Sequence, residues 1–146
     1  MRERIYKLDE IDAVARELLA SEVQPNAQHA TVWGLQGDLG AGKTTLVQAI
    51  ARVLGVGETV ASPTFILQKR YPLAGQRFAS LIHIDAYRLE SAAELKPLRL
   101  EETLSDPENL VLFEWPERAD AALPPHIKLL KLSVIDESTR RIVYGS

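Results

Sequence analysis

The chain has 146 residues, of which 46% are hydrophobic and 25% are charged, and its formal net charge at pH 7 is −3. This length and composition fit one globular domain with a hydrophobic core and exclude a disordered chain. The absence of cysteine excludes disulfides and thiolate metal sites. The slightly negative charge excludes a general basic surface for nucleic acid, so RNA would be reached through a partner or a local patch.

The N-terminal part of the chain is predicted to be a strand followed by a helix. Residues 2–7 form the strand, and Asp9 is expected to cap a helix that reaches about Ala20, because apolar residues follow at helical spacing. The first six residues carry three charges and lack the apolar core of a signal peptide, and no apolar run is long enough to span a membrane. We therefore expect a cytoplasmic protein with no membrane contact.

Residues 37–44 read G-D-L-G-A-G-K-T, which matches the phosphate-binding loop G-x-x-x-x-G-K-T. A strand-like segment at 31–35 precedes this loop, and an apolar pattern at helical spacing follows over 45–54, as the motif requires. Glycines allow the backbone N–H groups to surround phosphates, and the start of a helix adds positive potential. The expected nucleotide-binding residues are Gly37, Asp38, Leu39, Gly40, Ala41, Gly42, Lys43, Thr44 and Thr45.

The remaining elements complete a mixed sheet. Residues 65–71 and 77–84 are predicted to form one hairpin, and 127–134 with 140–144 a second one. The apolar run at 110–113 is typical of a central strand covered on both faces. Between these segments, Ser91 and Glu94 form a capping box for a short helix ending near Pro97, and Pro116 and Pro124-Pro125 indicate loops. We expect a single α/β domain of the P-loop NTPase type over residues 1–146, with a mixed central β-sheet flanked by helices.

Two carboxylates follow apolar strands. Asp85 comes after Leu81–Ile84, and Glu114 comes directly after Leu110–Phe113. A P-loop enzyme needs such an acid near the strand ends to hold or orient Mg²⁺. The sequence does not divide the roles between these two acids.

Several neighbouring residues allow more than one interpretation. Ser62-Pro63-Thr64 is by its chemistry a simple turn, although it stands where a switch segment would present a hydroxyl. Strand alternation places His83 on the same side as Asp85. Arg88 either steadies phosphate charge or pairs with a nearby acid, and Trp115 is either a stacking surface, an interface anchor or a packed side chain.

The missing motifs narrow the choice of activity. The sequence has no N-K-x-D motif for guanine and no arginine-rich lid after the P-loop. The residues therefore predict Mg²⁺-dependent binding of a nucleotide, with ATP and its hydrolysis favoured. A small-molecule kinase and a nucleotide-binding regulatory module that never hydrolyses remain alternatives.

Four motifs occur together along the chain. They are G-D-L-G-A-G-K-T-T at 37–45, S-P-T-F at 62–65, H-I-D-A-Y-R at 83–88 and E-W-P at 114–116. In this order and over essentially the whole length, the set resembles the TsaE family (formerly YjeE), the bacterial ATPases of the tRNA threonylcarbamoyladenosine pathway.

The resemblance implies a function within a larger assembly. TsaE proteins are small ATPases with weak activity on their own that associate with the TsaB–TsaD heterodimer. TsaD transfers the threonylcarbamoyl group to an adenosine beside the anticodon, and the ATPase is thought to reset the complex between cycles. Contact with tRNA is thus expected only indirectly, through the complex.

The resemblance also assigns site residues. Lys43 binds phosphates, Thr44 and Glu114 coordinate Mg²⁺, and Asp85 lies at the catalytic or partner-facing site. The segment that contains Ser62 becomes a switch instead of a simple turn. The residues expected to act as a switch or to face a partner are Ser62, Thr64, His83, Tyr87, Arg88 and Trp115.

Overall fold

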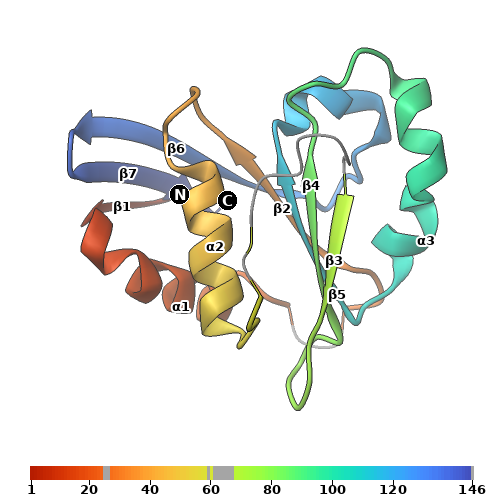
Figure 1. Cartoon of the computed structure of the whole chain (residues 1–146), viewed down its shortest axis with the longest axis horizontal. Coiled ribbons are helices and arrows are strands. Elements are labelled where there is room, and N and C mark those ends of the chain that lie inside the picture. The colour runs from red at the N-terminus through yellow and green to blue at the C-terminus, as the bar shows by residue number, and fades with distance from the viewer. Residues whose placement is uncertain (25–26, 59, 61–67, 146) are drawn as a thin grey trace.

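A seven-stranded mixed β-sheet forms the centre of the molecule (Figure 1), in a computed structural model that describes residues 1–24, 27–58, 60 and 68–145. The strands are β1 Arg2–Lys7, β2 Thr31–Gln36, β3 Gln68–Pro72, β4 Ser80–Asp85, β5 Asn109–Glu114, β6 Lys128–Asp136 and β7 Thr139–Tyr144. The helices are α1 Ile11–Ser21, α2 Lys43–Val53 and α3 Leu100–Ser105, with 3₁₀ segments η1 Leu8–Glu10, η2 Ala92–Leu98 and η3 Pro116–Ala122.

The sheet has a parallel centre and antiparallel edges. Its order is β1-β7-β6-β2-β5-β4-β3, in which β6, β2, β5 and β4 run parallel. The pairs β1–β7, β6–β7 and β3–β4 are antiparallel. The expected α/β class and mixed sheet are therefore confirmed, and so are both hairpins within the described residues.

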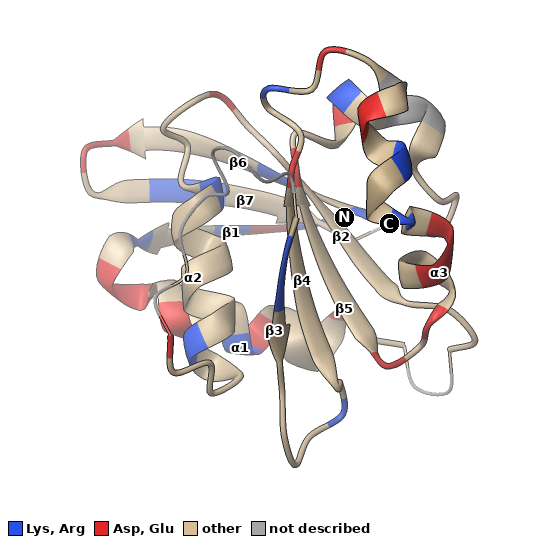
Figure 2. Cartoon of the chain, turned by 45° about the vertical axis from the view of Figure 1, so that its right-hand side comes forward, with Lys and Arg blue, Asp and Glu red and all other residues tan. Residues whose placement is uncertain are grey.

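Alternation along the central strands builds a separate core on each face of the sheet. Trp33 and Leu112 point toward α1 and α2 and belong to one cluster, whereas Val32, Val111 and Phe113 belong to the cluster on the opposite face. In Figure 1, α1 and α2 cover the first face and α3 lies on the other side. Figure 2 shows that charged residues are sparse on the central strands and lie mainly on helices, loops and strand ends. This burial explains why the strand at 110–113 is apolar at every position.

Three details of the sequence-based expectation were wrong. Asp9 does not cap α1, because the chain first makes the 3₁₀ turn η1 and the residue before α1 is Glu10, whose carboxylate accepts the Lys7 N–H at 2.8 Å. The helix α3 was not expected, and the loop expected around Pro116 contains η3. By contrast, the capping box at Ser91 and Glu94 is present, although η2 continues through Pro97 to Leu98. None of the helices in the described ranges is long and apolar enough to cross a membrane.

Candidate nucleotide-binding site

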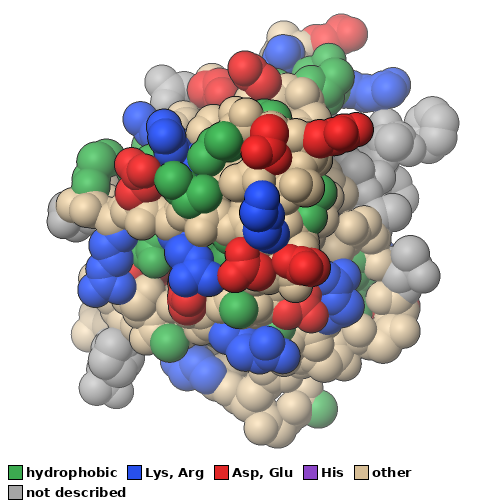
Figure 3. Space-filling view, turned by 90° about the vertical axis from the view of Figure 1, so that its left-hand side faces the viewer, with side chains coloured by type: hydrophobic (Ala, Val, Ile, Leu, Met, Phe, Trp, Pro, Cys, Tyr) green, Lys and Arg blue, Asp and Glu red, His purple; other side chains and the backbone are tan. Residues whose placement is uncertain are grey.

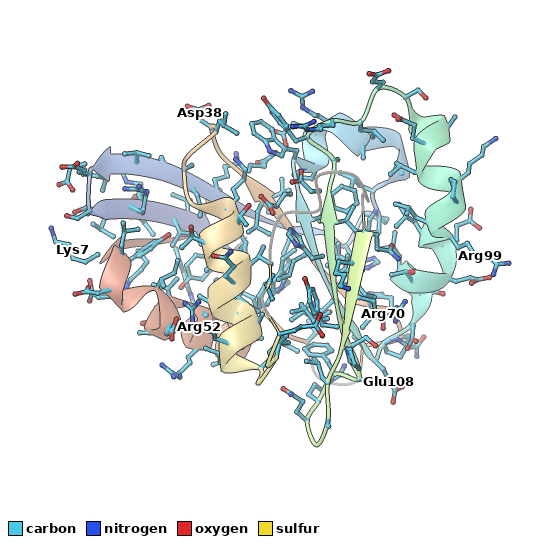
Figure 4. The ribbon with its side chains drawn as sticks, in the orientation of Figure 1. Lys7, Asp38, Arg52, Arg70, Arg99 and Glu108 are labelled. Carbon is cyan, nitrogen blue, oxygen red and sulfur yellow. The ribbon has the colours of Figure 1, made fainter. Side chains whose placement is uncertain are left out.

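The P-loop connects the end of β2 to the start of α2, where Figure 4 labels Asp38. Its glycines are required by the backbone. Gly37 and Gly42 have φ angles of 152° and 102°, and a Cβ on Gly37 would lie 2.6 Å from the carbonyl oxygen of Leu132. The loop can follow this path only with glycine at these positions, and the path directs the start of α2 toward a cavity at the end of the sheet.

Lys43, the first residue of α2, folds back over the loop. Its Nζ donates to the carbonyl oxygens of Gly37 and, at 3.0 Å, of Asp38, and it lies 4.0 Å from the centre of the Trp115 ring. Burial lowers the pKa of Lys43 from its ordinary value, and nearby carboxylates, above all Glu114, oppose this change. A bound triphosphate would favour the charged form of the amine further.

Thr44, Glu114 and His83 form a hydrogen-bonded chain beneath the loop. The Thr44 hydroxyl lies 2.9 and 3.1 Å from the two carboxylate oxygens of Glu114, and Nε2 of His83 lies 2.5 Å from Oε2 of the same carboxylate. Both Glu114 and His83 are buried. His83 was expected at a switch or a partner surface, but its side chain is 0% exposed and lies behind Glu114.

Asp85 stands beside Glu114 at the edge of the site. The two residues, each expected at the end of an apolar strand, are paired in the register of the parallel strands β4 and β5. One oxygen of Asp85 accepts the Tyr87 N–H at 2.9 Å. The two acids thus reach the same end of the sheet from adjacent strands.

Aromatic rings cover the outer side of this group. The rings of Tyr87 and Trp115 lie 5.0 Å apart, and the guanidinium of Arg118 lies 5.1 and 5.4 Å from their centres. Trp115 has a φ of 58°, which turns the chain sharply after Glu114. Its indole packs over Nζ of Lys43, the packed alternative among the roles that the sequence left open.

A cavity of about 580 Å³ joins these residues. It is lined by Leu8, Leu39, Gly40, Gly42, Lys43, Thr44, Thr45, Asp85, Tyr87, Arg88, Glu114, Trp115 and Arg140. Leu8 and Arg140 were missed from the sequence, because neither stands in a motif. The pairing of β7 with β6, next to β2, brings Arg140 to the P-loop, and the pairing of β1 with β7 brings Leu8. Ser62 and Thr64 lie outside the described residues.

Comparison with known proteins gives consistent matches. The family model described as "Threonylcarbamoyl adenosine biosynthesis protein TsaE" matches residues 6–142. A protein of Rickettsia felis is 37% identical over 125 residues, and one of Nostoc is 40% identical over 110 residues. Both bear the name "tRNA threonylcarbamoyladenosine biosynthesis protein TsaE". The aligned parts cover 85% and 73% of this chain, and 68% and 65% of the relatives, so the chain spans about two thirds of the length of these relatives.

A third relative and a solved structure extend the comparison. A Streptomyces coelicolor protein of the same name is 43% identical over 84 residues, which cover 57% of this chain and 55% of the relative. The crystal structure of Bacillus subtilis YdiB matches with a TM-score of 0.72 at 27% sequence identity, over 98% of this chain and 84% of that one.

Proposed function

The chain belongs to the TsaE family, and we propose that it binds Mg²⁺-ATP and hydrolyses it slowly, at a rate raised by a TsaB–TsaD heterodimer during the threonylcarbamoyl modification of tRNA. The observation that carries this proposal is the convergence of Lys43, Thr44 and Glu114 in one cavity at the start of α2. An amine, a hydroxyl and a carboxylate in this arrangement are the groups that a P-loop enzyme uses on a nucleotide and its metal.

Phosphate binding rests on the loop and Lys43. The N-terminal end of α2 presents backbone N–H groups and positive potential, which favour an anion. Lys43 lies on the same loop, held by the carbonyl oxygens of Gly37 and Asp38. Those contacts hold its Nζ against the loop, where the amine would bind the β- and γ-phosphates of a nucleotide that the loop surrounds.

The donor set fits a magnesium ion. Thr44 and Glu114 offer a hydroxyl and two carboxylate oxygens within 3.1 Å of one another, and Mg²⁺ prefers such hard oxygen ligands. When bound, the ion would neutralise charge that develops on the phosphate oxygens during hydrolysis. His83 acts here as a positioning residue, because its bond to Oε2 fixes the orientation of the Glu114 carboxylate.

Asp85 is proposed to orient the attacking water. It lines the same cavity, one strand farther from the P-loop than Glu114. Its carboxylate is oriented by the N–H of Tyr87. A carboxylate next to the metal ligand, in the same cavity, would be placed to accept a hydrogen bond from water at the γ-phosphate.

Trp115 offers a reason for weak activity without a partner. Its ring lies over Nζ of Lys43, so the indole must shift before the lysine is fully available to a triphosphate. Tyr87 is 37% exposed and touches the same indole, which gives a partner protein a surface through which it would move Trp115. Partner-stimulated hydrolysis follows from this arrangement, as a stimulating protein completes the site of a GTPase.

The kinase alternative has less support. A kinase needs an acceptor pocket next to the γ-phosphate, but two further cavities of the described residues share no lining residue with the P-loop cavity. One lies between η2 and α3, and the other lies near the ends of β6 and β7.

Phosphate release tests the proposal. The chain is incubated with ATP and Mg²⁺, alone and with purified TsaB–TsaD, in the absence of any small-molecule acceptor. We expect slow release of inorganic phosphate that rises with the heterodimer and is lost in Glu114→Gln. Nucleotide binding without any phosphate release under both conditions would instead favour a kinase or a non-hydrolysing module.

A further inference from the structure

A separate cavity lies beside the start of β6, where the pairing with β7 has ended. β2 pairs with β6 from Lys128 onward, whereas the pairing of β7 with β6 begins at Lys131, opposite Val143. The cavity has a volume of about 490 Å³. Within the described residues it shares no lining residue with the P-loop cavity, so a ligand there would not compete with the nucleotide for the same side chains.

Glu22 brings a buried carboxylate to this cavity. It follows the last residue of α1, it lines the cavity, and its side chain is only 6% exposed. Its Oε1 is buried and has no hydrogen-bond partner in the described ranges, and Nζ of Lys128 lies 3.9 Å away, too far for a hydrogen bond. A buried carboxylate oxygen without a hydrogen bond is costly, so this atom points to a ligand that donates to it.

The backbone of Glu22 is held in place from two sides. Its N–H donates to the carbonyl oxygen of Leu18 at 2.8 Å, and its carbonyl oxygen accepts the indole N–H of Trp33 at 3.2 Å. The carboxylate is therefore attached to a fixed point at the end of α1. Trp33 is joined to the same residue and can report on what binds there.

His126 adds a second polar atom in need of a partner. Its Nε2 is buried without a hydrogen bond in the part of the chain that the structure describes, and its ring stacks on that of His29 with the centres 3.5 Å apart. Burial, and then the neighbouring His29, lower the pKa of His126, which keeps the ring neutral at pH 7. A neutral imidazole nitrogen accepts or donates a hydrogen bond, so His126 offers the cavity a polar contact without a second charge.

The remaining walls of the cavity are basic and apolar. Lys131 is exposed and, with Lys128, brings two ammonium groups to the cavity. These groups attract a carboxylate and disfavour a ligand that carries only positive charge at Glu22. The apolar side chains of the lining include Ile127, Leu129 and Val143. A few polar groups among apolar walls are typical of a site for a small molecule.

We propose that this cavity binds a free α-amino acid with an apolar side chain, whose ammonium bonds to Glu22 and whose carboxylate lies against Lys128 and Lys131. The inference does not depend on nucleotide binding at the P-loop. By contrast, the face of the molecule in Figure 3 shows basic, acidic and hydrophobic side chains interspersed. Charges on such an open surface are solvated and bind weakly, whereas the carboxylate of Glu22 is buried.

The test compares three compounds with the same apolar body. They are leucine, leucinamide, which lacks the carboxylate, and 4-methylpentanoate, which lacks the ammonium. Calorimetry measures their dissociation constants with the unchanged chain. Leucine should bind, and each of the other two should bind about tenfold more weakly, because a charge-assisted hydrogen bond is lost.

Two variants assign the two charges of the ligand to their partners. Glu22→Gln should weaken leucine and leucinamide by about tenfold without weakening 4-methylpentanoate. Lys131→Gln should weaken leucine and 4-methylpentanoate by about threefold, since this lysine is exposed, and should leave leucinamide unchanged. Glu17→Gln is the matched control, because Glu17 lies on α1 with its side chain 42% exposed and pairs with Arg4. It should change the binding of none of the three compounds.

Tryptophan fluorescence gives a second readout. In Trp115→Phe, Trp33 is the only tryptophan left, and its indole N–H is bonded to the carbonyl oxygen of Glu22. Leucine should therefore change the emission of this variant.

Each other outcome would overturn the site. No binding of leucine, valine or phenylalanine to the unchanged chain up to about 10 mM would do so. Equal affinities for leucine, leucinamide and 4-methylpentanoate would show that neither charge is recognised. Leucine binding that persists unchanged in both Glu22→Gln and Lys131→Gln would place the amino acid elsewhere. Lys131→Gln alters only an exposed side chain, so it decides the matter if Glu22→Gln fails to fold.

Discussion

The two sides of β2 reach the same cavity by different means. On the β5–β4 side, parallel strands end in acids, and the residues stand in short motifs next to one another in the sequence. On the β6–β7 side, Arg140 and Leu8 come from opposite ends of the chain and meet because β1 pairs with β7 in antiparallel register. Chemistry that acts on phosphate is thus encoded locally, whereas the cavity wall formed by Arg140 and Leu8 depends on the assembled sheet.

The largest expected effect on ATP hydrolysis comes from a change in the P-loop motif. Lys43→Ala removes the amine that binds the β- and γ-phosphates, so ATP hydrolysis in the presence of TsaB–TsaD should fall by about 100- to 1000-fold. Circular dichroism and thermal unfolding serve as controls that the variant folds. Hydrolysis within a few-fold of the unchanged chain would show that the catalytic site lies elsewhere.

Two substitutions at His83 test whether this residue positions the Glu114 carboxylate or only fills space in the core. His83→Leu removes the short contact of Nε2 with Oε2 of Glu114 and leaves only the Thr44 hydroxyl there, so the Mg²⁺ concentration for half-maximal ATP binding should rise by about tenfold. His83→Gln offers an N–H donor at a similar position and should recover most of this loss. If both variants need the same Mg²⁺ concentration as the unchanged chain, His83 has only a structural role.

The pH dependence of binding distinguishes Lys43 from Arg140. Burial lowers the pKa of Lys43 in the free chain, and a bound triphosphate raises it again, so binding takes up a proton once the pH exceeds the free value. ATP affinity should therefore fall as the pH rises through the lowered pKa of Lys43. Arg140 keeps its charge over this range. Arg140→Ala should leave the slope unchanged, while Lys43→Met should remove it.

The lowered pKa of Lys43 also affects stability in a definite direction. The unfolded chain holds its proton up to the ordinary lysine pKa, whereas the folded chain releases it earlier. Between these two pH values the unfolded state binds more protons, so this group's contribution to the free energy of unfolding rises with pH. In Lys43→Met this rise should be absent from denaturant unfolding series taken through the pH range below the ordinary lysine pKa. An identical rise in the variant would contradict the assignment.

The smallest expected effect concerns Trp115. Its ring lies against Lys43, whereas Trp33 is fully buried between the sheet and the helices α1 and α2, with its indole N–H bonded to the carbonyl oxygen of Glu22. ATP should change the tryptophan fluorescence of the unchanged chain, and Trp115→Phe should abolish the change while altering ATP affinity only about two- to fivefold. A signal that persists in Trp115→Phe would place the nucleotide near Trp33 instead.

The positions of the P-loop and of the two acids can be predicted from the sequence, because their signals lie in short stretches of the chain. The P-loop glycines are needed because the backbone there has a positive φ. The apolar run at 110–113 indicates a strand buried on both faces, and Glu114 marks the end of that strand. The sequence places Asp85 and Glu114 each at the end of an apolar strand, and the parallel register of β4 and β5 then sets them side by side.

Other features could not be predicted because they depend on tertiary packing. The helix α3 has only 6 residues, too few for a helical period to stand out from its surroundings. The burial of His83 follows from its place on β4 beneath the start of α2, while its sequence shows only a polar residue in an apolar run. Arg140 stands in a strand pattern like that of Arg141, and the pairing with β1 together with the turn at Asp136 decides which of the two faces the P-loop.

A crystal structure with a non-hydrolysable ATP analogue and Mg²⁺ tests the central claim most directly, because it locates both ends of the nucleotide at once. We predict the triphosphate against Lys43 and the ion on Thr44 and Glu114. A triphosphate away from Lys43, or an ion bound away from Thr44 and Glu114, would contradict the account.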